Sequence, residues 1–356
     1  MERVQFQQEQ MLNELKDLVE KNLFTDKEAK QIMKQRTIYE TALVRRVARK
    51  ADFLRYAAYE MSLEQLRRKR VERLKLKPAP ASISDYALVK RQFEIFERAV
   101  RKFKSDVGLW VQYIQVAKRE GARSLVGRIT ARALQMHPNN PSLFILAASH
   151  ELDHHSPSAA RTLMQRGIRL NPESIDLWKE YVKMELGYIE SLRRRWEVLG
   201  IKTSGEEETE GREETEEEGN VGADARRKVM EGEIVAQVIS SAGQGMNDIS
   251  LVEMNRLIKK LTTAIPRVEL FESIKDVISE FPTTADLRKR LLCHLYDEVH
   301  KVLGNEPKAV VFRASRFIGT EGVVGIEKAL KEIEEIIGKG SLEYKIFIKE
   351  WIHKIT

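Results

Sequence analysis

One short string in the sequence has the composition of a catalytic metal site. Residues 150 to 154 read His-Glu-Leu-Asp-His, which satisfies the His-Glu-x-x-His pattern of zinc hydrolases. On a helix the two imidazoles would share one face, and Glu151 would polarise a zinc-bound water. Against this interpretation, Pro157 ends the helix within a turn of His154, and no third ligand is evident downstream. A zinc hydrolase therefore stays an alternative that bound metal in the purified protein would reveal.

Other reactive residue types lack the surroundings that their chemistry requires. The glycines at 243 and 245 and at 319, 322 and 325 follow no strand, so they predict turns and no phosphate-binding loop. Cys293 is the single cysteine and lies in an apolar run, which predicts a buried structural thiol in a reducing, intracellular compartment. No apolar run is long enough to span a membrane. We expect no enzyme, no cofactor, no metal and no small-molecule substrate.

The stretch from Gln92 to Leu186 consists of three segments that superpose without a gap. Small residues stand at positions 99, 133 and 167, so each step is 34 residues. An arginine precedes each of them, and an aromatic residue follows each by eleven positions; these residues are Arg98, Arg132 and Arg166, then Trp110, Phe144 and Trp178. A period of this length is typical of stacked helical hairpins that cannot bury their apolar faces alone.

Each unit reads as two helices separated by a short break. Apolar residues recur at three-four spacing in the first helix, and Pro138 or Pro172 stands six residues before the aromatic, where one helix ends and the next begins. Aromatic residues at helical spacing usually belong to the hydrophobic core. We therefore expect the space between helices to be filled by Trp110, Phe144 and Trp178, with Tyr113 and Tyr181.

The detailed pattern distinguishes two repeat families of the same length. A tetratricopeptide repeat requires Gly and Tyr four and seven residues after its Trp, whereas here Glu151 or Glu185 stands seven residues after the aromatic and a tyrosine three after it. The chain thus resembles the half-a-tetratricopeptide (HAT) repeat of RNA-processing assemblies. Its clearest copy comprises Arg166, Pro172, Trp178, Tyr181 and Glu185. We expect Glu60, Glu151 and Glu185 to pair with Arg98, Arg132 and Arg166, in an order that the sequence leaves open.

The amino-terminal part adds an earlier copy and a basic insertion. Residues 2 to 34 predict two amphipathic helices, the second capped near Thr25 or Asp26. Ala42, Phe53, Tyr56 and Glu60 then restore the repeat register, displaced by an insertion at 61–84. That insertion holds the basic cluster Arg67, Arg68, Lys69 and Arg70. A solvated face, a nuclear-import signal and sequence-independent contact with RNA phosphates all remain open for it.

Charge separates two regions of a chain whose net charge is +7. Residues 36 to 77 carry 13 Lys and Arg against 5 Asp and Glu, whereas residues 206 to 218 carry 9 Glu and one Arg. The acidic stretch cannot bury enough apolar surface to fold, so 201–225 predicts a disordered linker. Basic residues are not interleaved with exposed aromatics, which argues against sequence-specific recognition of RNA.

The first 200 residues resemble one family in particular. The strings Asp17–Thr25, Ile32–Arg36, Asp52–Glu60 and Leu66–Arg70, with Asp176–Leu186 downstream, are similar to the U3 small nucleolar RNA-associated protein 6 family. That family contributes a HAT-repeat subunit to a propeller-rich subcomplex of the small-subunit processome. The resemblance implies a non-catalytic nucleolar scaffold in pre-18S ribosomal RNA processing, with WD40-propeller proteins as partners. It also implies that the U3 ribonucleoprotein and pre-ribosomal RNA are met mainly through the assembly.

The predicted architecture is therefore all-α. It comprises an N-terminal helical region at 1–35, a HAT-repeat solenoid at 36–200, the linker at 201–225 and a C-terminal helical region at 226–356. A degenerate copy is expected around Pro282, where Arg288 replaces the aromatic residue, and a terminal hairpin from Ile326 to Thr356. The alternative function is a HAT-repeat scaffold in messenger RNA splicing or 3′-end processing.

Overall fold

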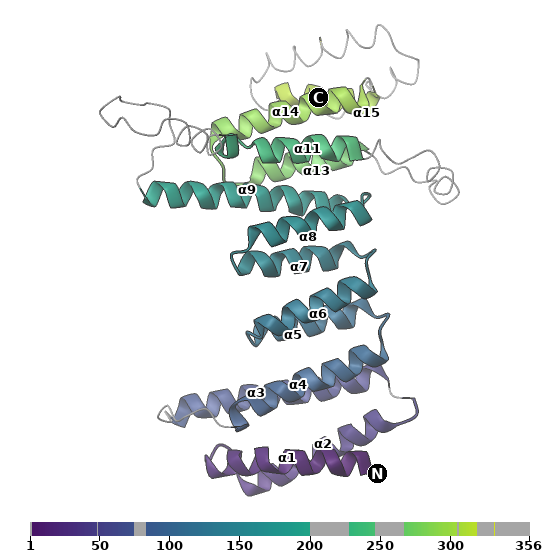
Figure 1. Ribbon diagram of the computed structural model, residues 1–356, viewed down its shortest axis with the longest axis vertical. Helices are drawn as coiled ribbons and strands as arrows, with labels where there is room; N and C mark the ends of the chain where they lie inside the picture. Colours follow the sequence, from purple (N-terminus) through teal and green to yellow (C-terminus); the bar gives the residue numbers. More distant parts are fainter. Residues whose placement is uncertain are drawn as a thin grey trace, which may run out of the picture. The chain divides into compact units, whose positions relative to one another are not determined.

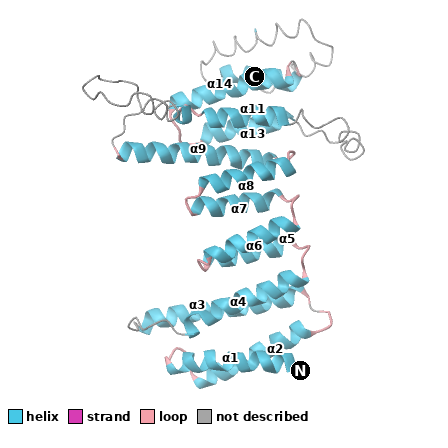
Figure 2. Ribbon diagram, viewed as in Figure 1, coloured by secondary structure: helices cyan, strands magenta, loops and turns pink. Residues whose placement is uncertain are grey.

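All regular structure in the described part of the chain is α-helical. The computed structural model describes residues 2–47, 49–74, 83–199, 228–245, 267–304, 306–318 and 331, and these ranges contain helices and their connections without a strand (Figure 2). The prediction of an all-α helical-repeat fold is confirmed. The chain divides into two compact units, residues 1–138 and 139–356.

The first unit is built from three helical hairpins (Figure 1). Its helices are α1 (Glu2–Glu20), α2 (Asp26–Val44), α3 (Lys50–Leu74), α4 (Ile83–Lys102), α5 (Val107–Arg119) and α6 (Arg123–Met136). Within the hairpins α1 packs on α2, α3 on α4 and α5 on α6, while α4 also packs against α1 and α5. Leu15, Leu18, Phe24 and Leu63 belong to a buried cluster that joins the first two hairpins.

The second unit begins with the hairpin of α7 and α8 and continues into a group of longer helices. Its described helices are α7 (Pro141–Asp153), α8 (Pro157–Leu170), α9 (Ile175–Val198), α11 (Glu233–Gly245), α13 (Arg267–Glu280), α14 (Ala285–Leu303) and α15 (Pro307–Ile318). Helix α9 packs against α7, α8, α11 and α13, and α14 packs against α11, α13 and α15. Thus α9 links the repeat hairpin to the C-terminal helices.

Side-chain caps fix where several helices begin. Thr25 and Glu28 form a capping box at α2: the Glu28 N–H donates to Thr25 Oγ1 at 3.3 Å, and the Thr25 N–H donates to Glu28 Oε2 at 2.9 Å. The predicted cap at Thr25 is confirmed. Asp106 caps α5, and Ser174 caps α9. These oxygens satisfy amide groups that have no partner inside the helix.

The structure tests some of the predicted element boundaries, and others lie outside the described residues. Helix α3 runs on to Leu74, so the first part of the insertion at 61–84 is a helical extension of the repeat helix. Gly243 and Gly245 lie in the last turn of α11, so the predicted turn there is wrong; glycine is tolerated where a helix ends. The linker at 201–225, the glycines at 319, 322 and 325, and the terminal hairpin, residue 331 excepted, lie outside the described residues.

Candidate functional site

The tryptophans of the repeat fasten each helix to the turn before it. Trp110 Nε1 donates a hydrogen bond to the carbonyl oxygen of Lys104 at 3.0 Å, and Trp178 Nε1 donates to that of Pro172 at 3.1 Å. The spacing is six residues in both cases. In the degenerate copy the guanidinium of Arg288 donates to the carbonyl of Phe281 at 2.9 Å. Arg288 therefore keeps the hydrogen bond to the preceding turn although it replaces the aromatic ring.

Phe144 holds the corresponding position in the middle repeat but has no N–H to donate. It packs instead against α8 at Gly167, where a Cβ atom would lie 2.8 Å from Phe144 Cγ. A separation below 3.0 Å is too short for two carbon atoms, so α7 and α8 approach this closely only because residue 167 has no side chain.

The repeat tyrosines are buried, and their rings have partners. The Tyr113 ring stacks on Phe96 with centroids 5.5 Å apart, and burial raises the pKa of Tyr113 to about 12. The Tyr181 hydroxyl accepts a hydrogen bond from Gln165 Nε2 at 3.1 Å, and burial raises its pKa as well. Both tyrosines are therefore neutral near pH 7 and belong to the packing between helices.

Two of the repeat glutamates form buried bidentate ion pairs, with arginines that the sequence analysis did not single out. Glu60 on α3 binds Arg36 on α2 at 2.7 and 2.8 Å, and Glu185 on α9 binds Arg161 on α8 at 2.6 and 2.7 Å. Each arginine precedes its glutamate by 24 residues. That constant offset was the available signal; residue 127, the same distance before Glu151, is glycine.

The arginines expected to be the partners bind other glutamates. Arg98 on α4 binds Glu40 on α2 through two contacts of 2.9 Å, and Arg132 on α6 binds Glu97 on α4 at 2.9 and 3.0 Å. These pairs join second helices of successive hairpins, whereas the pairs of Glu60 and Glu185 join a second helix to the following first helix. The expectation that Glu60 and Glu185 pair with Arg98, Arg132 or Arg166 is wrong, because Arg36 and Arg161 on the adjacent helices bind these glutamates. Arg166 is exposed, and residue 131, in register with Glu97, is alanine.

The basic cluster Arg67–Arg70 is largely engaged within the first unit. Arg67 binds Glu64 at 2.8 Å and Asp85 at 3.4 Å, and Arg68 binds Glu64 and Glu120. Lys69 is exposed. The ion pairs fasten the extended end of α3 to α4 and α5, so RNA or import contact by this cluster stays a prediction.

Arg70 fastens the same end of α3 to the turn between α1 and α2. It binds Glu28 at 2.7 Å and the carbonyl of Leu23 at 2.7 Å, and its guanidinium lies 4.8 Å from the centre of the Phe24 ring. The hydrogen bond from Arg70, together with the one from the Thr25 N–H, lowers the pKa of Glu28 to about 2.

The residues first considered for chemistry have little around them that could perform it. The rings of His150 and His154 meet edge to face with centroids 4.4 Å apart. Among the described residues no group of three or more His, Cys, Asp or Glu side chains could hold a metal ion. Cys293 is exposed, so the prediction of a buried thiol is wrong: its helix, α14, turns Leu291 and Leu295 inward and Cys293 to solvent.

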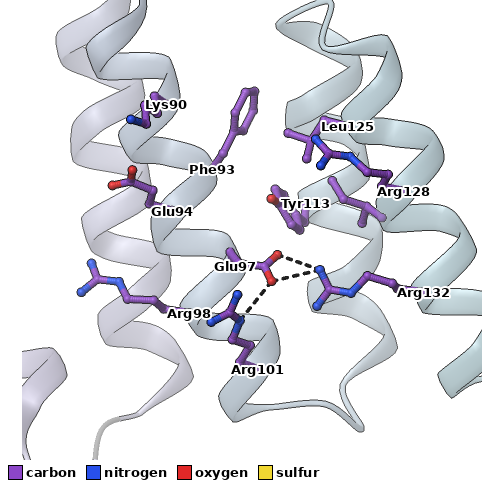
Figure 3. Close-up of a pocket in the computed structure, with 11 residues that line it drawn as sticks. Lys90, Phe93, Glu94, Glu97, Arg98, Arg101, Tyr113, Leu125, Arg128 and Arg132 are labelled. Atoms are coloured by element: carbon purple, nitrogen blue, oxygen red, sulfur yellow. Dashed lines mark hydrogen bonds and ion pairs between the residues drawn. The ribbon is translucent and has the colours of Figure 1, made fainter.

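A groove of about 740 Å³ lies between α4 and α6 in the first unit (Figure 3). Its apolar lining comes from Phe93 on α4, Tyr113 on α5, and Leu125 and Ile129 on α6. Phe93 projects from α4 into the space between the helices, and Tyr113 and Leu125 lie on the other side of that space (Figure 3). The groove is therefore formed mainly by the second helices of two successive hairpins.

Basic side chains surround this apolar lining. Five cations line the groove against the two carboxylates of Glu94 and Glu97; the cations are Lys90, Arg98, Arg101, Arg128 and Arg132. Glu97 binds both Arg101, at 3.1 Å, and Arg132, as the dashed lines in Figure 3 mark. No pattern in the sequence indicates this groove, because its charged residues are spread over two helices that only folding brings together.

The first half of the chain is similar in sequence to several known proteins. The family model described as U3 small nucleolar RNA-associated protein 6 matches residues 8–91. The chain is 43% identical over 199 residues to U3 small nucleolar RNA-associated protein 6 of Schizosaccharomyces pombe, covering 56% of this chain and 41% of that protein. It is 37% identical over 194 residues to the Mus musculus homologue and 35% over 197 residues to the Homo sapiens homologue.

The chain is related to the U3 small nucleolar RNA-associated protein 6 family. The matches cover 54% and 55% of this chain for the mouse and human proteins, and 32% and 33% of those proteins. The chain thus matches less than half the length of these relatives. The part matched by the family model includes the Arg36–Glu60 ion pair and the Arg67–Arg70 cluster. None of the described helices is long and apolar enough to cross a membrane.

Proposed function

We propose that the chain is a non-catalytic scaffold subunit of the small-subunit processome that supports nucleolar processing of pre-18S ribosomal RNA. The observation that carries the proposal is the match of residues 8–91 to a family described as U3 small nucleolar RNA-associated. Relatives from a yeast, a mouse and a human carry the same description. Because those relatives are longer than the matched region, their partners come to this chain as part of the proposal.

The proposed mechanism is geometric. Stacked helical hairpins present extended surfaces on which other proteins can dock, and WD40-propeller subunits of the same subcomplex are the proposed partners. Buried ion pairs such as Arg36–Glu60 hold the hairpins in fixed register, which preserves the spacing of side chains on such a surface. No residue in this proposal performs chemistry, and no cofactor or small molecule is required.

Contact with U3 RNA and pre-ribosomal RNA is proposed to occur mainly through the assembly. Sequence-independent RNA binding requires cations that are free to neutralise phosphates. In the basic cluster, however, Arg67, Arg68 and Arg70 are held by Glu64, Asp85, Glu120 and Glu28. Because these arginines are already paired with carboxylates of the same chain, we expect this cluster to contribute less to RNA binding than unpaired cations would.

The test is affinity purification of the tagged protein from its native cells at moderate and at high salt, with identification of proteins and sequencing of RNA. We expect WD40-propeller proteins to persist at high salt, while U3 and pre-ribosomal RNA are lost because phosphate contacts weaken with salt. Recovery of splicing or 3′-end processing factors without U3 would favour the alternative HAT-repeat scaffold. Recovery of RNA alone, lost steeply with salt, would favour autonomous RNA binding.

A further inference from the structure

The groove between α4 and α6 combines an apolar lining with cations that lack acidic partners. Arg98 is bound to Glu40, and Arg101 and Arg132 share Glu97. Lys90 and Arg128 are exposed and have no carboxylate partner among the described residues. The groove is thus both open and incompletely neutralised.

The existing ion pairs indicate what chemistry this surface accepts. Along the second helices, an arginine of one helix binds a glutamate of the preceding one, as in Arg98–Glu40 and Arg132–Glu97. Arg128 lies one helical turn before Arg132 on α6 and has no such glutamate. A ligand that carries carboxylates would supply the same interaction at Arg128 from outside.

The apolar lining argues for a protein ligand and against RNA. Bases bind on open aromatic faces. Here the Tyr113 side chain is 2% exposed and its ring already stacks on Phe96, and the half-buried Phe93 ring lies against Tyr113 with ring centroids 6.4 Å apart. Leu125 is half-buried and offers aliphatic surface, which suits apolar side chains and gives nothing to a phosphate backbone.

We propose that this groove binds an acidic amphipathic helix of a partner protein. Apolar residues of that helix, at three-four spacing, would pack on the half-buried Phe93 and Leu125, and its carboxylates would face Lys90 and Arg128. The inference rests on the proposed scaffold function and specifies the chemistry of one partner segment. It assigns binding to the face formed by the second helices.

The experiment is selection of a displayed library of short amphipathic helical peptides, random in charge, against the purified full chain. Each selected peptide is then titrated against the wild type, against Lys90→Glu with Arg128→Glu, and against Leu125→Gln. Arg55→Glu is the matched control, because the Arg55 side chain is 73% exposed on α3 and lies outside the groove. Circular dichroism and thermal unfolding verify that every variant is folded.

We expect enrichment of peptides rich in Asp and Glu that bind about tenfold or more weakly to each groove variant and normally to Arg55→Glu. Failure to enrich any peptide, or enrichment of peptides that ignore the groove variants, would overturn the proposal. A single-stranded RNA oligomer is titrated in parallel. RNA binding that is lost in the charge-reversed variant, with no peptide enriched, would assign the groove to RNA instead.

This outcome is separable from that of the proposed function. If propeller proteins copurify with the wild type from cells but no acidic peptide is selected, the scaffold function stands and the groove assignment fails. If acidic peptides bind the groove but no processome component copurifies, the groove assignment stands and the choice of assembly fails.

Discussion

The two compact units rely on ion pairs between helices to different extents. In the first unit, ion pairs with buried members join helices far apart in sequence, as Arg36–Glu60 and Arg98–Glu40 do. The described part of the second unit has one such pair, Arg161–Glu185. Its glycines in addition permit close apolar contact, at Gly167 against Phe144 and at Gly232, where a Cβ atom would lie 2.8 Å from Leu287 Cδ1. Helix contacts in one repeat architecture can therefore be made both by directional ion pairs and by tight apolar packing.

The largest expected effect comes from breaking the most buried ion pair. In Glu60→Gln the guanidinium of Arg36, which is 0% exposed, loses its counter-charge, so the free energy of unfolding of the first unit should fall by about 3–5 kcal/mol. Hydrogen exchange measured by mass spectrometry on α2 and α3 would report the change. Replacing both partners, Arg36→Met with Glu60→Leu, should recover most of the loss, since no charge is left buried and unpaired.

Glu72→Gln is the control for that comparison, because Glu72 lies exposed on the same helix. If Glu60→Gln unfolds no more readily than Glu72→Gln, charge does not stabilise the first unit and the contrast between the units is lost.

The second expected effect separates two glycines in equivalent helices of the two units. Gly167→Ala forces a Cβ atom against Phe144 and should destabilise the second unit, by about 1–3 kcal/mol for such overpacking less about 1 kcal/mol gained in helix propensity. Gly127→Ala in α6 meets nothing within 4 Å and should stabilise the first unit by up to about 1 kcal/mol. Chemical denaturation monitored by circular dichroism, with hydrogen exchange to assign the unit, measures both.

A compensating larger-to-smaller substitution provides a further check on the same contact. In the Gly167→Ala background, Phe144→Leu removes the ring that the new methyl group meets and should restore part of the lost stability. Equal effects of alanine at 127 and 167 would contradict the idea that close apolar contact distinguishes the second unit.

The smallest expected effect is a pH dependence confined to the first unit. The pKa of Glu28 is lowered from 4.5 to about 2 by Arg70, so its carboxylate stabilises the folded state above pH 4.5 and this contribution is lost as the pH falls toward 2. Thermal unfolding between these pH values should show a smaller decline in Glu28→Gln than in the wild type. Because Glu28 is partly exposed, added salt should also reduce the difference at neutral pH. An unchanged acid profile in Glu28→Gln would show that other carboxylates dominate.

Much of the fold is predictable because it follows from local periodicity. The 34-residue register locates Trp110 and Trp178 in the repeat, and residue type and position narrow the cap of α2 to Thr25 or Asp26, of which Thr25 is the cap. The partners of Glu60 and Glu185 were missed since several arginines lie within reach in sequence, and only the packing of adjacent helices selects Arg36 and Arg161. The groove at Arg128 was missed for the same reason.

The wrong prediction for Cys293 has a different cause: burial depends on which side of its helix a residue faces, as well as on its neighbours in sequence. Cys293 has apolar neighbours in sequence, yet the α-helix turns it away from the side that Leu291 and Leu295 share. The division at residue 138 falls within the predicted repeat region. In the copy next to this division, Gly127 stands where the following copy has Arg161, and Ala131 stands where the preceding copy has Glu97.

The hydrogen bonds of Trp110 and Trp178 to the turns before their helices determine where the chain can change in length. A residue added between Lys104 and Trp110, or between Pro172 and Trp178, would move the indole away from its carbonyl and release the start of the following helix. The far end of a hairpin is under no such limit, as the extension of α3 to Leu74 demonstrates. Evolution and protein engineers alike are therefore expected to place insertions, labels or tags between the two helices of a hairpin.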